Sequence, residues 1–146
     1  MYRPHSPGKT APLVPVDDSE MAERAVRYAL EAHPDTEITV LHVVGEPSPM
    51  MGKAMSLALE DDIEQAAEEH VSAVLECAHD IADQFDTEIT TDVAWGTPAK
   101  VTINRAEVFD TVIISSHRGT LADRLFVENV AQKVFRRSPV PVTVVC

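Results

Sequence analysis

The sequence has little cysteine and no long hydrophobic run. Cysteine occurs only at positions 77 and 146 of the 146 residues. Two cysteines are too few for a disulfide scaffold and are typical of a reducing compartment. No apolar run is long enough to span a membrane, and residues 1–9 lack the hydrophobic stretch of a signal peptide. We therefore expect a cytoplasmic protein with no membrane partner.

Basic residues are also scarce. Lys and Arg number 12 against 24 Asp and Glu, so the formal net charge is −12. A surface this acidic repels nucleic acid and anionic membranes, which excludes both as expected partners. Such a surface remains soluble at high salt, where screening removes self-repulsion, so it predicts a salt-loving source. An ordinary acidic cytosolic protein is the alternative. Lysine is the scarcer base, with Lys9, Lys53, Lys100 and Lys133.

Glycine is missing from the key positions of a predicted phosphate-binding unit, although Gly119 lies in its loop. The apolar run at 111–114 predicts a strand, residues 115–120 a loop, and the following residues a helix that ends at Arg137. Such loops hold anions in parallel α/β folds, usually through glycines that bring backbone N–H groups close to the phosphates. This loop instead begins with Ser115 and contains His117 and Arg118.

Strand and helix patterns alternate along the whole chain. This alternation with right-handed crossovers predicts a parallel sheet with helices on both faces. We expect one domain at 12–146, preceded by a loose tail at 1–11. Residues 45–51 read as a loop rich in Pro and Gly. The predicted strands are 13–16, 38–44, 88–95, 111–114 and 140–145, and the helical patterns are 21–29, 56–85, 99–108 and the one ending at Arg137.

Three residue types carry structural expectations. Cys77 falls on the apolar stripe of the long helical pattern, so we expect a buried small side chain. Trp95 precedes a tight turn and is expected to pack against the protein. The histidines show no spacing suited to zinc, so no metal site is expected.

Catalytic signatures are missing. The sequence contains neither a nucleophile elbow nor a Walker-type Gly-Lys-Ser/Thr motif. Ser115, Ser116 and His117 are adjacent, but neighbours in a loop do not make a triad without a positioned carboxylate. A hydrolase is therefore the weakest function class, and we expect no enzyme.

Four segments together resemble the universal stress protein family. The resemblance covers about residues 12–146 and implies a single-domain, Rossmann-like, five-stranded parallel sheet of order 3-2-1-4-5 with helices on both faces. The segments are Val14-Pro15-Val16-Asp17 followed by Ser19-Glu20, Leu41-His42-Val43-Val44, Gly96-Thr97-Pro98-Ala99, and the stretch 115–145 with Asp123-Arg124-Leu125, Val130-Ala131, Arg136-Arg137 and Pro139-Val140-Pro141-Val142.

The resemblance also implies a homodimer, commonly through the last strand. The sequence supports this, because residues 140–145 are short, apolar and last, which is typical of an edge strand. An uncovered apolar edge invites pairing, and a two-fold axis satisfies it. The expected edge residues are Val140, Val142 and Val144. An edge capped by the N-terminal tail is the alternative.

Nucleotide-binding members of the family bind ATP or AMP and resemble one another after the fourth strand, in the pattern Gly, two residues, Gly, nine residues, Gly, then Ser or Thr. Here the three glycines fall on Ser115, Arg118 and Glu128, the hydroxyl falls on Asn129, and His117 keeps the family type. The nucleoside half of the site is retained. The resemblance implies that Asp17 contacts the nucleoside and that the backbone of Val43 faces adenine, beside Pro15.

Glu128 decides between two predictions. Its carboxylate would occupy the helix N-terminus where phosphates bind, and a second charge about 4 Å away costs about 4 kcal/mol, or about three decades of affinity. We therefore predict a regulatory or protective stress-response homodimer that has lost the ATP phosphate motif and carries no cofactor. The alternative is a nucleotide switch for ATP or AMP, with a rebuilt phosphate site around Arg118 and His117.

Overall fold

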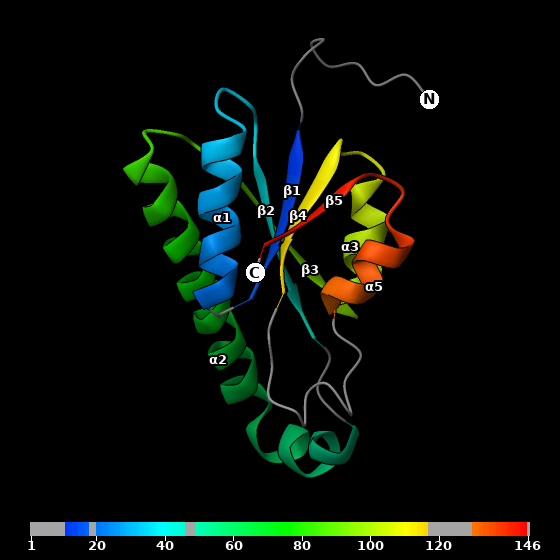
Figure 1. The fold of residues 1–146 in the computed structure, drawn as a ribbon. Coiled ribbons are helices and arrows are strands. Elements are labelled where there is room, and N and C mark those ends of the chain that lie inside the picture. Colours follow the sequence, from blue (N-terminus) through cyan, green and yellow to red (C-terminus); the bar gives the residue numbers. More distant parts are fainter. Residues whose placement is uncertain (1–10, 18–19, 46–48, 117–129, 146) are drawn as a thin grey trace.

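The computed structural model describes residues 11–17, 20–45, 49–116 and 130–145, with backbone only for 49–64 and 67. Strands and helices alternate, and the helices α1 and α2 cover one face of the sheet while α3 and α5 cover the other (Figure 1). The elements are β1 (Pro12–Val16), α1 (Glu20–Ala32), β2 (Thr39–Val44), α2 (Pro49–Gln84), β3 (Thr90–Trp95), α3 (Pro98–Ala106), β4 (Thr111–Ser115), α5 (Val130–Arg137) and β5 (Val142–Val145).

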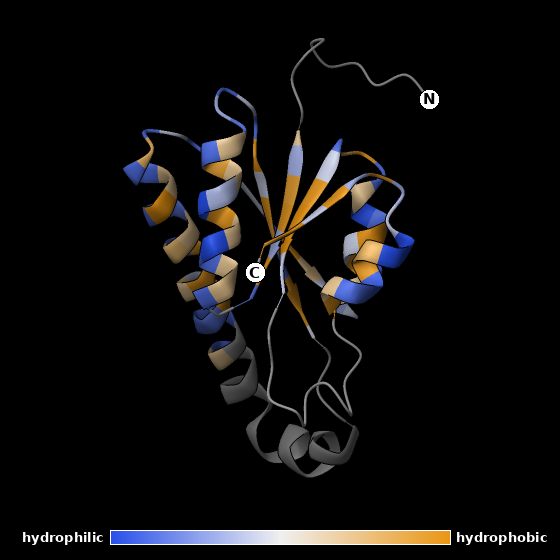
Figure 2. Cartoon of the chain, in the orientation of Figure 1, coloured by the Kyte–Doolittle hydropathy of each residue, from blue (hydrophilic) through white to orange (hydrophobic). Residues whose placement is uncertain are grey.

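The sheet has five strands in the order β3-β2-β1-β4-β5, and every recorded pairing is parallel. The predicted fold class and strand order are therefore confirmed. The central strands are apolar on both faces because helices cover both, which is why β1, β2 and β4 read as nearly continuous hydrophobic runs. Figure 2 shows this, with hydrophobic colour along the strands and hydrophilic colour on the outward faces of the helices.

Two hydrophobic clusters form the core, one on each face of the sheet. The first cluster lies against α1 and α2 and includes Val14, Val40 and Ile113. The second lies against α3 and α5 and includes Leu13, Leu41 and Val112 from three neighbouring strands. Alternate residues of one strand enter different clusters, as the period of two in a strand requires.

The turn from β3 into α3 depends on three adjacent residues. Gly96 has φ +138°, a conformation that L side chains rarely adopt, and a Cβ there would lie 3.2 Å from Cγ2 of Val101. The Gly96 N–H donates to the Val44 carbonyl at 3.0 Å, which ties the turn to β2. Thr97 then occupies the N-cap position and Pro98 starts the helix, as proline commonly does at a first turn.

One buried hydroxyl on α3 has no partner. Thr102 is 1% exposed, and among the described residues its Oγ1 is the buried side-chain oxygen or nitrogen left without a hydrogen bond. An unsatisfied buried hydroxyl costs stability, because the group has lost water without replacing it.

Several expectations about individual residues need correction. α2 begins at Pro49, so the predicted loop at 45–51 is too long, and proline suits this first helical position. Ser115 is the last residue of β4 and not part of the loop. Val140 precedes β5 and is partly buried against the second cluster, so it lies just outside the strand. Trp95 is 63% exposed, so the prediction that it packs is wrong.

None of the helices in the described ranges combines the length and the apolar character that a membrane crossing requires.

Candidate functional site at the carboxyl edge of the sheet

The chain reverses its winding direction between β1 and β4, which are neighbours in the sheet. From β1 it crosses to β2 through α1, whereas from β4 it reaches β5 through α5 on the opposite face (Figure 1). Parallel α/β folds bind ligands in the crevice outside such a switch point. The site is thus defined by the carboxyl ends of β1 and β4.

The strand registers place most of the predicted nucleoside half at this edge. Pro12 pairs with Thr111 and Leu13 with Val112, and the same register continued leads to Val16 beside Ser115. On the other side Val16 pairs with His42, so Asp17 follows at the level of Val43.

The four described site candidates differ in exposure. Asp17 is exposed just beyond β1, and Val43 and Pro15 are half-buried. Ser115 is only 8% exposed, so little of its side chain reaches the crevice. Pro15 pairs with Leu41 but has no N–H to donate. His117, Arg118, Glu128 and Asn129, the candidates for the phosphate side, lie outside the described residues.

His42 is a residue of this region that the sequence did not single out. It is 6% exposed, and its Nδ1 lies 3.0 Å from the carbonyl oxygen of Val16. A carbonyl only accepts, so Nδ1–H donates and fixes the ring at the end of β1. The ring of His70 from α2 lies 5.9 Å from it between centroids, tilted by 57°. A histidine interrupting a buried strand was the signal that could have revealed this contact.

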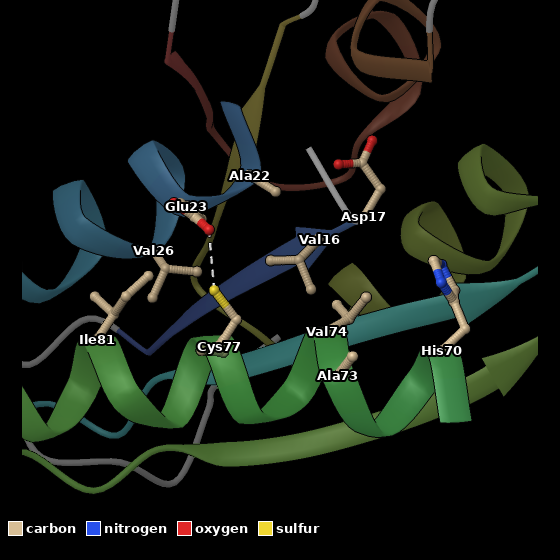
Figure 3. Close-up of a pocket in the computed structure, with 11 residues that line it drawn as sticks. Val16, Asp17, Ala22, Glu23, Val26, His70, Ala73, Val74, Cys77 and Ile81 are labelled. Atoms are coloured by element: carbon tan, nitrogen blue, oxygen red, sulfur yellow. Dashed lines mark hydrogen bonds between the residues drawn. The ribbon is translucent and has the colours of Figure 1, made fainter. Parts of the chain in front are cut away.

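A cavity of about 240 Å³ opens between α1, α2 and the end of β1 (Figure 3). Asp17 and Val16 form its β1 end, and His70 lies toward that same end on α2. Neither Val43 nor Ser115 is among its lining residues, so the cavity adjoins the crevice on one face of the sheet and shares Asp17 with it.

Cys77 lies in the wall of this cavity and is a free thiol. It packs against the first cluster but is only half-buried. Its Sγ donates a hydrogen bond to Oε1 of Glu23 at 3.0 Å. That hydrogen bond, followed by burial and by the charge of the carboxylate, raises the pKa of the thiol from 9.0 to about 11. A thiol held in its protonated form is a poor nucleophile and a poor metal ligand.

Proteins usually hold a metal ion with several His, Cys, Asp or Glu side chains that lie close together. Within the part of the chain that the structure describes, no group of three or more such residues could hold an ion.

The strand order and the parallel pairing define a doubly wound α/β protein, and comparison with known proteins gives the family. The model of the universal stress protein family matches residues 13–145, and the chain belongs to that family. Among curated protein sequences none matches it significantly.

Solved structures share this fold at low identity. The universal stress protein UspA from Lactobacillus plantarum superposes with a TM-score of 0.72 at 21% identity, covering 94% of this chain and 97% of that one. A universal stress protein in complex with cAMP gives 0.67 at 21% identity, covering 94% and 97%. An Arabidopsis thaliana family member with AMP bound gives 0.64 at 18% identity, covering 93% and 90%.

Proposed function

We propose that this chain is a regulatory or protective stress-response protein that acts as a homodimer through protein contacts and does not hold ATP by a glycine phosphate motif. It is not an enzyme in this proposal, and it needs no cofactor. The observation that carries the proposal is that the sequence keeps the family residues for the nucleoside half of the site but lacks the glycines of the phosphate half. Asp17 and Val43 stand at the switch point, as a nucleoside would require.

The phosphate side differs in charge and in backbone freedom. Ser115 stands in place of the first glycine, and its side chain is already buried at the end of β4. The sequence then places Arg118 and Glu128 where the second and third glycines stand in binding members. Side chains at these places keep backbone N–H groups away from phosphate oxygens, and the carboxylate of Glu128 repels them.

A calorimetric titration of the purified protein with ATP tests the loss of tight binding. We expect a Kd no tighter than about 1 mM, a binding free energy of about −4 kcal/mol. The double variant Arg118→Gly with Glu128→Gly should bind more tightly. Exchange of an exposed acidic residue far from the crevice, Glu107→Gly, serves as the control for charge and for glycine. A low-micromolar Kd for the unmodified protein would contradict the proposal.

A nucleotide switch is the second candidate, and the AMP-bound and cAMP-bound family members favour it. In this second proposal Arg118 and His117 attract the phosphates, a task that backbone N–H groups beside the motif glycines perform in nucleotide-binding members. Guanidinium is a good phosphate ligand. The two candidates are separated by the ultraviolet absorbance of the denatured, freshly purified protein. A nucleotide peak at 260 nm supports the switch, and its absence supports the first proposal.

The dimer in this proposal forms along β5. This strand is last in the sheet order, with β4 as its recorded neighbour, and Val144 is 36% exposed. Unpaired backbone groups beside apolar side chains favour pairing with a second copy. We also infer a halophilic archaeal source from the charge pattern, since the net charge is −12 and lysine is scarce.

A further inference from the structure

The cavity between α1 and α2 combines an apolar wall with carboxylates, and the described residues that line it include no lysine or arginine. We propose that it binds a small organic ammonium ion, a protonated amine with a compact aliphatic or aromatic body. This site shares Asp17 with the crevice but lies between α1 and α2, and Glu23, its main charge, comes from α1 (Figure 3).

The wall supplies the apolar part of the site. The apolar residues that line the cavity include Val26, Val74 and Ile81. Each is at most 7% exposed, because its side chain also packs into the first cluster. The volume of about 240 Å³ is below the roughly 300–1,000 Å³ of pockets for drug-sized ligands. It therefore suits a compact molecule and excludes a nucleotide.

Glu23 supplies the charge. The hydrogen bond from Cys77 turns this carboxylate into the gap between the two helices, 3.0 Å from the sulfur, as Figure 3 shows. The thiol is neutral and uses one of about four acceptor positions that a carboxylate offers. An ammonium group can donate to the remaining positions with full charge complementarity.

The other charged groups around the cavity fit the same ligand. Asp17 adds a second carboxylate at the β1 end. The positive charge of Arg27 acts on Cys77 by lowering the pKa of the thiol. Its guanidinium donates to Oε1 of Gln84 at 2.9 Å, and Arg27 does not line the cavity. His70 contributes a ring that lies against His42. A cationic ligand therefore meets two carboxylates, and no lysine or arginine stands among the described lining residues.

The test is a two-dimensional ¹H–¹⁵N NMR titration of the full chain with benzylammonium chloride, with benzyl alcohol as the neutral probe of similar shape. We expect saturable shift changes at the amides of Ala22, Val26 and Val74, with a Kd of about 1 mM, as small ligands of this size reach. Benzyl alcohol should bind at least about fivefold more weakly, because it lacks the charge.

Two variants locate the site. Glu23→Gln should weaken benzylammonium binding by about fivefold, the range of a partly exposed ion pair. Glu76→Gln is the matched control, because Glu76 is an exposed residue of the same helix as Cys77 and does not line the cavity. Ala73→Leu fills the cavity from an exposed position and should abolish saturable binding without disturbing the core.

The proposal is overturned if benzyl alcohol binds as tightly as benzylammonium, or if Glu23→Gln and Glu76→Gln change the Kd equally. Shift changes confined to residues outside α1, α2 and the end of β1, or no saturation at all, would overturn it as well. Failure of ATP to bind has no bearing on these outcomes, so this result and that of the ATP titration are read separately.

Discussion

The sulfur of Cys77 and the carboxylate of Glu23 join α2 to α1 through a hydrogen bond of 3.0 Å. The two residues come from neighbouring helices, 54 positions apart in the sequence, and the carboxylate end of the bond is exposed. The bond keeps the proton on sulfur and holds the carboxylate at the cavity, so it affects both the reactivity of the thiol and the charge of the site.

Cys77 should react slowly with iodoacetamide. Its pKa of about 11 leaves up to about a hundredfold less thiolate at pH 8 than a thiol at the ordinary 9.0. Glu23→Gln should raise the rate, because the charge that opposes deprotonation is gone. Peptide mapping by mass spectrometry distinguishes Cys77 from Cys146, and Glu76→Gln should leave the rate as it is.

The same group makes stability depend on pH at the alkaline end. The folded state holds the thiol proton more tightly than the unfolded state, since its pKa is raised from 9.0 to about 11. The contribution is therefore complete below pH 9 and is lost as the pH rises toward 11. Urea unfolding of Cys77→Ser beside the unmodified protein measures it. A gap between the two that does not narrow over this interval would contradict the assignment.

Gly96→Ala should destabilise the protein by about 1–3 kcal/mol, because an L residue is strained at this backbone conformation. The added Cβ would also crowd Val101 at 3.2 Å. Gly45→Ala is the matched control, since a Cβ there meets nothing within 4 Å. Urea denaturation at constant m-value gives both numbers, and equal effects at the two glycines would argue against strain at Gly96.

Thr102→Val should leave stability unchanged or raise it by about 1 kcal/mol, because it replaces an unsatisfied buried hydroxyl with a methyl group of similar size. Thr102→Ser keeps the hydroxyl and loses the methyl, so it should cost about 1 kcal/mol. Thermal unfolding compares the two. A clear loss of stability in Thr102→Val would mean that the hydroxyl makes a favourable interaction after all.

Val144→Lys should convert a β5-paired dimer into a monomer, since a lysine on the edge opposes strand pairing. Light scattering coupled to size exclusion measures the mass, with 16.0 kDa expected for the single chain. Val108→Lys is the control, because Val108 is 76% exposed and lies in the turn between α3 and β4, outside any strand. A mass that does not respond to Val144→Lys would place the dimer contact elsewhere or exclude it.

Salt should stabilise the protein. With a net charge of −12, repulsion between acidic groups opposes the compact state, and screening shortens its range from about 10 Å at 0.1 M to about 3 Å at 1 M. We expect the Tm to rise between 0.1 M and 2 M KCl. Sucrose at matched water activity is the control, because it stabilises proteins by exclusion from their surface and does not screen charge. A Tm that falls over this range would point to the ordinary acidic cytosolic protein.

The parallel sheet was predictable from the alternation of strand and helix patterns, and its strand order from the resemblance of four segments to the family. Runs such as 13–16 and 111–114 are apolar on both faces, and only a central parallel strand satisfies such a pattern. Asp17 and Val43 were named as site residues from the resemblance, and the register of β1 against β2 brings them to one edge of the sheet.

What the sequence could not give depends on contacts between elements. Tryptophan is a large apolar side chain that usually packs in a core. Trp95 lies on the edge strand β3, however, and remains exposed. The start of α2 at Pro49 was hidden by the turn-forming residues around it, although proline is suited to a first helical position. The hydrogen bond between Cys77 and Glu23 joins two helices whose separation no local pattern encodes.

The pairing of β1 with β4 has a consequence for how the chain is made. Ala11 bonds to Asp110 across 99 positions, so the first strand of the sheet waits for a partner from the last third of the chain. During synthesis β1 and β2 can associate early, but one side of β1 stays open until β4 has left the ribosome. Contacts of such long sequence separation slow folding, and the exposed side of β1 is where an incomplete chain is most prone to aggregate.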